Sequence, residues 1–155
     1  MDALTDIREV APTDPALAPL ITRHLDLMYA QSPGCSVHAM DASSLADAGV
    51  RFFAAFEDGE AVAMGALKPL AGATGELKSM HVRMDKRGGG LADAILERLL
   101  TTAGTLGMHQ IYLETGSQAE FAPARAFYTR HGFGLCPPFE GYTEDPASVF
   151  MTRRL

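Results

Sequence analysis

The most informative stretch of the chain is Arg87-Gly88-Gly89-Gly90-Leu91-Ala92, which lies between a strand-like run and the start of a helical pattern. Glycines let a backbone approach an anion closely, and the first turn of a helix carries free N–H groups and the positive end of the helix dipole. The stretch is therefore expected to form a cradle for a phosphate or diphosphate group, to which Lys86 and Arg87 add positive charge. A turn that binds no ligand is the alternative interpretation.

Two common nucleotide-binding motifs do not fit this stretch. A P-loop requires a Gly-Lys pair, and the chain contains none. A Rossmann fingerprint that starts at Gly88 requires a glycine where Asp93 stands, and one that starts at Gly90 requires a glycine where Ala92 stands. The predicted cradle therefore belongs to another class of phosphate site.

Hydrophobic periodicity outward from the cradle predicts a mixed α/β fold. The Asp58-Gly59 pair indicates a hairpin, and Asp14-Pro15 is typical of a helix start. The order predicts a central mixed, mostly antiparallel sheet with helices on both faces. Strands are expected at 7–10, 50–56, 61–67, 76–82, 110–115 and 149–153, and helices at 14–32, near 45, at 91–106 and at 123–131.

Composition places limits on the class of protein. A chain of 155 residues with 47% hydrophobic and 21% charged residues is expected to form one domain, residues 1–155. The chain has no long apolar run and no signal-like start, and its two cysteines suggest free thiols, so a soluble cytoplasmic protein without a membrane partner is expected. The net charge of −6 argues against nucleic-acid binding, and the spacing of the five histidines predicts no metal site.

Two segments resemble one known family. Arg87 to Ala92 resembles the pattern [Q/R]-x-x-G-x-[G/A] of the GCN5-related N-acetyltransferases (GNAT), and Ala124 to Phe133 resembles the family signature A-x-x-F-Y-x-x-x-G-F. The resemblance extends over nearly the whole chain. It implies a GNAT-like sheet that is splayed between strands 76–82 and 110–115 to admit coenzyme A. One position departs from the pattern, because Phe121 stands where many members have asparagine.

The resemblance also implies an activity and a cofactor site. The expected reaction is direct transfer of an acetyl group from acetyl-CoA to a primary amine of a small molecule or peptide, and a homodimer is one assembly to expect. Tyr128 would lie near the thioester sulfur as a general acid, and a core tyrosine is the alternative. The residues expected to bind the cofactor are Met80, His81, Val82, Arg87, Gly88, Gly89, Gly90, Leu91, Ala92, Phe127 and Tyr128.

The acceptor side is predicted from the same resemblance and from strand alternation. Glu76 is the candidate base, since histone-type members carry a glutamate at the matching place on this strand. A period of two would put Glu76 on one sheet face with Lys78, Met80 and Val82. Glu114 or a chain of water molecules could serve as the base instead. Glu76 could also be a solvated residue at the strand end without a catalytic role. The residues expected to bind the acceptor are His38, Lys78, Glu114 and Tyr142.

Two other classes of function stay open at this point. The first is a non-catalytic module that binds acyl-CoA as a sensor. The second is an interaction protein that has the fold without the ligand, because a fold does not by itself establish a function.

Overall fold

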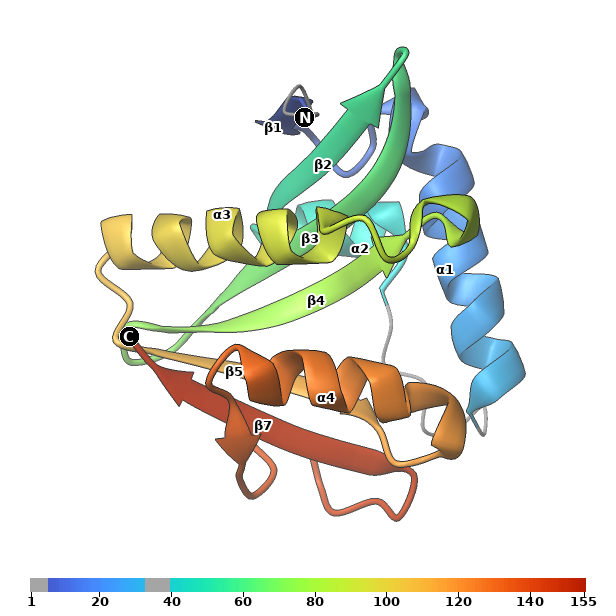
Figure 1. Ribbon diagram of the computed structural model, residues 1–155. Helices are drawn as coiled ribbons and strands as arrows, with labels where there is room; N and C mark the ends of the chain where they lie inside the picture. Colours follow the sequence, from blue (N-terminus) through green and yellow to red (C-terminus); the bar gives the residue numbers. More distant parts are fainter. Residues whose placement is uncertain (1–5, 33–39) are drawn as a thin grey trace.

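The computed structural model describes residues 6–32 and 40–155. Its seven strands form one sheet in the order β1-β2-β3-β4-β5-β7-β6 (Figure 1). The strands are β1 (Asp6–Glu9), β2 (Arg51–Glu57), β3 (Glu60–Leu70), β4 (Thr74–Val82), β5 (Gln110–Gly116), β6 (Gly134–Leu135) and β7 (Ser148–Arg154). The helices are α1 (Ala18–Gln31), α2 (Ala42–Asp47), α3 (Leu91–Thr105) and α4 (Ala122–Arg130), with short 3₁₀ turns η1 (Pro15–Leu17), η3 (Met84–Lys86) and η4 (Ala119–Phe121).

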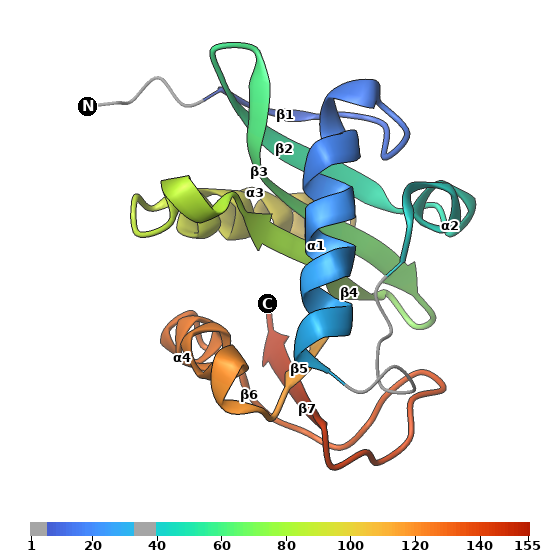
Figure 2. The ribbon, with the colours of Figure 1, turned by 90° about the vertical axis from the view of Figure 1, so that its right-hand side faces the viewer.

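The sheet is parallel only between β4 and β5. Their pairing is confined to Thr74–Leu77 with Gln110–Leu113, and beyond Leu77 the two strands separate. Figure 1 shows them spreading from a common end, and Figure 2 looks into the side on which they have parted. The predicted mixed, mostly antiparallel sheet and its splay are therefore confirmed.

The helices cover both faces of the sheet, as expected. Figure 2 shows α1 running along the open side, with α3 and α4 on one side of the sheet and α2 on the other. One hydrophobic core lies between the sheet and α3, where Ile95, Leu96 and Leu99 are fully buried. A second core joins α1 and α2 to the other face through Leu17, Leu45 and their neighbours. Helices from both cores line the gap between β4 and β5, α1 from one face and α3 and α4 from the other.

Local signals account for most element boundaries. The Asp14 side chain accepts a hydrogen bond from the Ala16 N–H at 2.9 Å, so the predicted helix start is confirmed. Asp58 and Gly59 both have positive φ angles, which is the conformation of the predicted two-residue hairpin. The short strand β6 was not predicted, because two exposed residues carry no periodic pattern. Among the described residues, no helix has the length and apolar character needed to cross a membrane.

One irregularity in β4 changes the expected arrangement of side chains. Ser79 has a φ of +57°, and the register with β3 shifts between Met64 and Ala66, so Ser79 and Met80 lie opposite Gly65 in a β-bulge. A Cβ atom on Gly65 would lie 2.6 Å from the Met80 sulfur, so glycine is required for this close packing.

The bulge reverses which face of the sheet the side chains of β4 occupy. Met80 and Val82 pack against the α3 core, as Leu77 does, whereas His81 contacts α1. Glu76 lies on the face opposite to Leu77. The prediction that Glu76 shares a face with Met80 and Val82 is therefore wrong, because a period of two does not continue through a bulge.

Candidate active site

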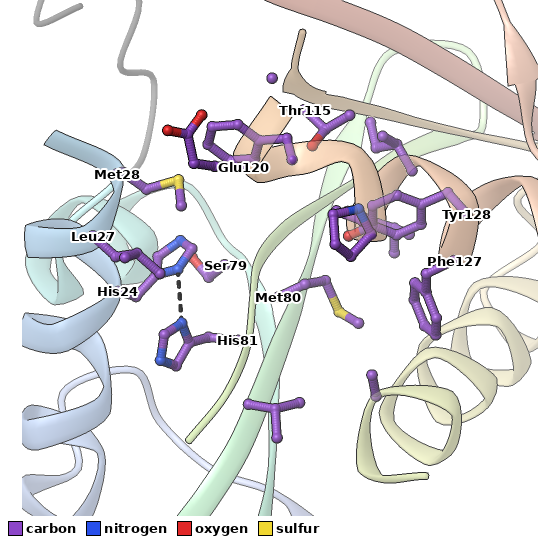
Figure 3. A pocket seen from close by; sticks show the side chains of 18 of the residues that line it. His24, Leu27, Met28, Ser79, Met80, His81, Thr115, Glu120, Phe127 and Tyr128 are labelled. Carbon is purple, nitrogen blue, oxygen red and sulfur yellow. Dashed lines mark hydrogen bonds between the residues drawn. The ribbon is translucent and has the colours of Figure 1, made fainter. Parts of the chain in front are cut away.

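A cavity of about 690 Å³ lies in the gap between β4 and β5. Side chains from α1, β4, β5 and α4 line it together with the glycine stretch, and Figure 3 shows them converging on it. Its volume is within the roughly 300–1,000 Å³ that is typical of small-molecule sites. The splay of the sheet thus opens a cleft that most of the predicted cofactor residues line, together with Glu76, Lys78 and Glu114.

The glycine stretch forms one end of this cavity. Gly88 and Gly90 have φ angles of +84° and +86°, a conformation that costs other residues about 1–2 kcal/mol. Gly90 is the N-cap of α3, and no side chain among residues 6–32 and 40–155 caps that helix at its start. The first N–H groups of α3 therefore face an open cradle, which suits an anionic group such as a diphosphate.

Two basic side chains stand at the cradle. Lys86 forms an ion pair with Glu57 at 2.7 Å. The Arg87 Nε donates a hydrogen bond to the Val82 carbonyl at 3.1 Å, which fixes the side chain against the end of β4. Both residues line the cavity, so the predicted positive charge is present at its glycine-rich end.

The edge of β4 beyond Leu77 is the second feature that suits the cofactor. Pairing with β5 ends there among the described residues, so the backbone of Met80, His81 and Val82 is not bonded to β5. All three residues line the cavity. An extended ligand with amide groups fits such an edge as an additional strand would.

Tyr128 lies on the α4 side of the cavity, next to Phe127 (Figure 3). Its side chain is buried, and its ring contacts that of Phe133 at 5.8 Å between centroids. Burial raises the pKa of the Tyr128 hydroxyl above its ordinary value. The phenol therefore stays protonated at neutral pH and is able to donate a hydrogen bond into the cavity.

Glu76 belongs to a buried polar cluster with Lys78 and Tyr142. The Tyr142 hydroxyl donates to Glu76 Oε2 at 2.7 Å, and the Lys78 Nζ donates to the same oxygen at 3.3 Å and to the Tyr142 hydroxyl at 3.2 Å. Glu76 is only 2% exposed, so the alternative of a solvated strand-end residue is wrong. Burial and the Glu76 carboxylate both raise the pKa of Tyr142.

The predicted acceptor residues differ in whether they line the cavity. Glu76 and Lys78 line the cavity, whereas Tyr142 is not among the lining residues and contacts Glu76 and Lys78. Glu114 lines the cavity and accepts a hydrogen bond from the Ser148 hydroxyl at 2.7 Å. His38 lies outside the described residues. The role of Glu76 as a base stays a prediction.

Sequence reasoning missed a pair of histidine side chains in the wall of the cavity. The Nδ1 atoms of His24 on α1 and His81 on β4 are 3.4 Å apart, and both rings are buried (Figure 3). Burial and neighbouring cations lower the pKa of each ring to about 4. The available signal was the position of His24 on the apolar stripe of α1, next to Leu20 and Ile21.

A second missed group joins α3 to α4 beside the cradle. Asp93 Oδ1 contacts His131 Nε2 at 2.7 Å and Arg130 Nη2 at 3.0 Å. The hydrogen bond from His131 is the main cause that lowers the pKa of Asp93. Asp93 and Arg130 both line the cavity, so this contact links α3 to α4 at its glycine-rich end.

Comparisons with known proteins agree with this geometry. Residues 17–133 match the model of the acetyltransferase (GNAT) family. The uncharacterized N-acetyltransferase YsnE of Bacillus subtilis is 40% identical over 136 residues, which cover 88% of this chain and 90% of the relative. The IAA acetyltransferase of Azospirillum brasilense is 35% identical, with full coverage of both chains. A Klebsiella pneumoniae structure, named as an acyl-CoA N-acyltransferase, superimposes with a TM-score of 0.81 at 30% identity and 99% coverage of both chains.

Proposed function

The chain belongs to the acetyltransferase (GNAT) family, and we propose that it transfers an acetyl group from acetyl-CoA to a primary amine of a small molecule or peptide. The observation that carries the proposal is the continuity of the cleft. It leads from the uncapped N-terminus of α3, along the open edge of β4, to the buried hydroxyl of Tyr128. A diphosphate, a chain of amides and a thioester follow one another in the same order in acetyl-CoA.

Each part of the cleft has a task in this reaction. The N–H groups at the start of α3 and the Arg87 guanidinium bind the diphosphate, and the edge of β4 orients the pantetheine amides. Acetyl-CoA supplies the acyl group in activated form, as a thioester. The Tyr128 hydroxyl donates its proton toward the sulfur as the C–S bond breaks, which prevents a free thiolate from accumulating.

The acceptor end of the cleft favours a cationic substrate. Glu76 and Glu114 both line it, although Lys78 offsets part of the charge of Glu76. The whole chain has a net charge of −6. Carboxylates that line a cleft raise the local concentration of positively charged ligands, and most primary amines are protonated at neutral pH. An ammonium substrate therefore suits this end of the cavity.

The first test measures thermal unfolding with and without acetyl-CoA. A ligand at about 100 times its dissociation constant stabilises the folded state by roughly 2.7 kcal/mol, which is easily detected. The matched variant is Gly89→Glu, which adds a carboxylate to the glycine stretch that forms the cradle. A Cβ at Gly89 meets only the Lys86 carbonyl at 3.6 Å, so the fold accommodates it, whereas Gly90 would be strained by its positive φ.

Gly104→Glu is the control, since it adds the same charge about 20 Å further along α3, where a Cβ meets nothing within 4 Å. Stabilisation of the wild type and of Gly104→Glu, but not of Gly89→Glu, supports the cradle. Thiol release is then measured with a panel of amines and with IAA, after which one relative is named. Stabilisation without thiol release would instead indicate a non-catalytic module that binds acyl-CoA.

A further inference from the structure

The histidine pair separates two cavities. His24 lines the large cleft, while His81 lines both the cleft and a second cavity of about 280 Å³ between α1 and the glycine stretch. Arg23, Asp26 and Arg87 also line the second cavity. Figure 3 shows His24 and His81 joined by their hydrogen bond, on the side of the cleft opposite Tyr128. The two rings therefore form a polar path between the cavities, beside Leu27 and Arg87, which line both.

Hydrogen bonding within the pair leaves one nitrogen unexplained. Between two Nδ1 atoms one ring must donate and the other accept, so the outer Nε2 atoms carry complementary roles. The Nε2 of His81 is buried and has no hydrogen-bond partner in the described part of the chain. A buried polar atom without a partner costs about 1–3 kcal/mol, so its retention requires an explanation.

The proposed reaction produces a proton that must leave the cleft. An ammonium that becomes an amide loses two protons from its nitrogen as the C–N bond forms and the C–S bond breaks. One of them balances the proton that Tyr128 gives to the sulfur, and the other has to reach solvent. Because the two products then occupy the cleft, a route through its wall would let this proton leave.

We propose that His24 and His81 form a proton relay that carries this second proton from the acceptor amine to the outer cavity. The inference rests on the acetyl transfer proposed above. His24 Nε2 accepts the proton in the cleft, and His24 Nδ1 passes its own hydrogen to His81 Nδ1. His81 Nε2, which is buried in the structure, then releases its hydrogen to water that reaches it from the outer cavity by local opening of the wall. Each ring gains one N–H bond and loses one, so no charge accumulates, and exchange with water restores the starting tautomers.

The charges around the pair suit transfer better than storage of a proton. Lys78 lies near His24, and Arg23 and Arg87 lie near His81, while Asp26 lines the outer cavity. Burial and these cations keep both rings neutral at pH 7, with His24 able to accept. A diphosphate at Arg87 would offset the charge of this cation. Cofactor binding would therefore raise the pKa of His81 and make the pair a better proton acceptor.

The test compares His24→Gln, His81→Gln and the double variant with His109→Gln. His109 contacts the Gly72 carbonyl at the far end of β4 and lines neither cavity. Thermal unfolding and acetyl-CoA binding are measured first, followed by single-turnover transfer to the amine that gives the fastest thiol release. Each relay variant is expected to lose about 100-fold in turnover rate, which is typical of a lost acid–base group, and to retain acetyl-CoA binding.

Two readouts separate a relay from a purely structural role. The double variant should be no slower than either single variant, because the rings act as one unit. Free imidazole should restore turnover to His24→Ala, since the vacated space opens into the cleft. Turnover within threefold of the wild type in both single variants, additive losses, or no rescue would overturn the relay.

Failure of the proposed function looks different. If the wild type releases no thiol from acetyl-CoA with any amine, both the acetyl transfer and the relay are refuted. If the wild type is active and the histidine variants are equally active, only the relay is refuted.

Discussion

The buried cluster of Glu76, Lys78 and Tyr142 allows a sharp prediction about stability. The side chains of Glu76 and Lys78 are only 2% and 7% exposed, so solvent screens their interaction weakly. Lys78→Met removes the ammonium and leaves the Glu76 carboxylate buried, with the Tyr142 hydroxyl still donating a hydrogen bond to it at 2.7 Å. Breaking a buried pair by removing one partner costs about 3–5 kcal/mol, because a charge is left uncompensated.

The expected effect on unfolding is large. For a chain of this length each kcal/mol lowers Tm by about 2–4 °C, so Lys78→Met should lower it by roughly 6–20 °C. Adding Glu76→Gln to Lys78→Met removes the orphaned charge but keeps an oxygen for Tyr142, so the double variant should recover most of the loss. Urea unfolding at pH 7 gives the free energies of the two single variants and the double variant.

Lys68→Met is the control, because Lys68 lies on β3 in register with Glu76, is half-buried, and forms no ion pair in the described residues. It should change the free energy of unfolding by less than about 1 kcal/mol, as most substitutions outside the core and polar networks do. A loss below 1 kcal/mol in Lys78→Met would refute the reasoning. So would a double variant whose loss equals the sum of the single losses.

Three further predictions concern the cavity and its walls. Tyr128→Phe should keep its affinity for acetyl-CoA within about twofold of the wild type and lower turnover, measured as thiol release, by about 100-fold. The control Tyr29→Phe, at an exposed position, should change neither. Turnover of Tyr128→Phe equal to that of the wild type would exclude an acid role. Gly65→Ala should lower the free energy of unfolding in urea by about 1–3 kcal/mol, because its Cβ would lie within 3.0 Å of Met80, Ile95 and Leu99. The control Gly104→Ala should stabilise α3 by up to about 1 kcal/mol. A Gly65→Ala variant as stable as the wild type would contradict the close packing. The free energy of unfolding should fall as the pH drops from 6.5 towards 4, because the unfolded chain binds protons at His24 and His81 that the folded chain binds only near pH 4. The loss of stability should reach roughly 2 kcal/mol for each ring by pH 5. Urea unfolding at several pH values measures this loss, and His24→Gln and His81→Gln should each reduce it.

The architecture was predictable from the sequence because its signals are local. Apolar periodicity located every long helix and strand, and Asp14-Pro15 and Asp58-Gly59 marked a helix start and a hairpin by their own backbone preferences. The cradle was predictable for the same reason, since glycines directly before a helix define it without reference to distant residues.

The wall of the cleft was not predictable in this way. The partners in the Glu76–Tyr142 and His24–His81 contacts are 66 and 57 residues apart in the chain, and no periodic pattern connects them. The sequence predicts Glu76 as a candidate base, but its hydrogen-bond donor Tyr142 reaches it from the loop before β7. His24 occupies an apolar stripe, where a histidine is easily taken for a packing residue.

The bulge at Ser79 is a further feature of the cleft that could not be predicted from the sequence. Serine rarely adopts a positive φ, so nothing in the sequence marks the point at which β4 changes phase. Without the bulge, Met80 would face α1 and His81 would face α3, since side chains alternate along a regular strand. With it, Met80 packs toward α3 while His81 meets His24, and one strand contributes to both walls of the cleft. The residue that permits this is Gly65 on the neighbouring strand, because any larger side chain there would occupy the space that Met80 requires.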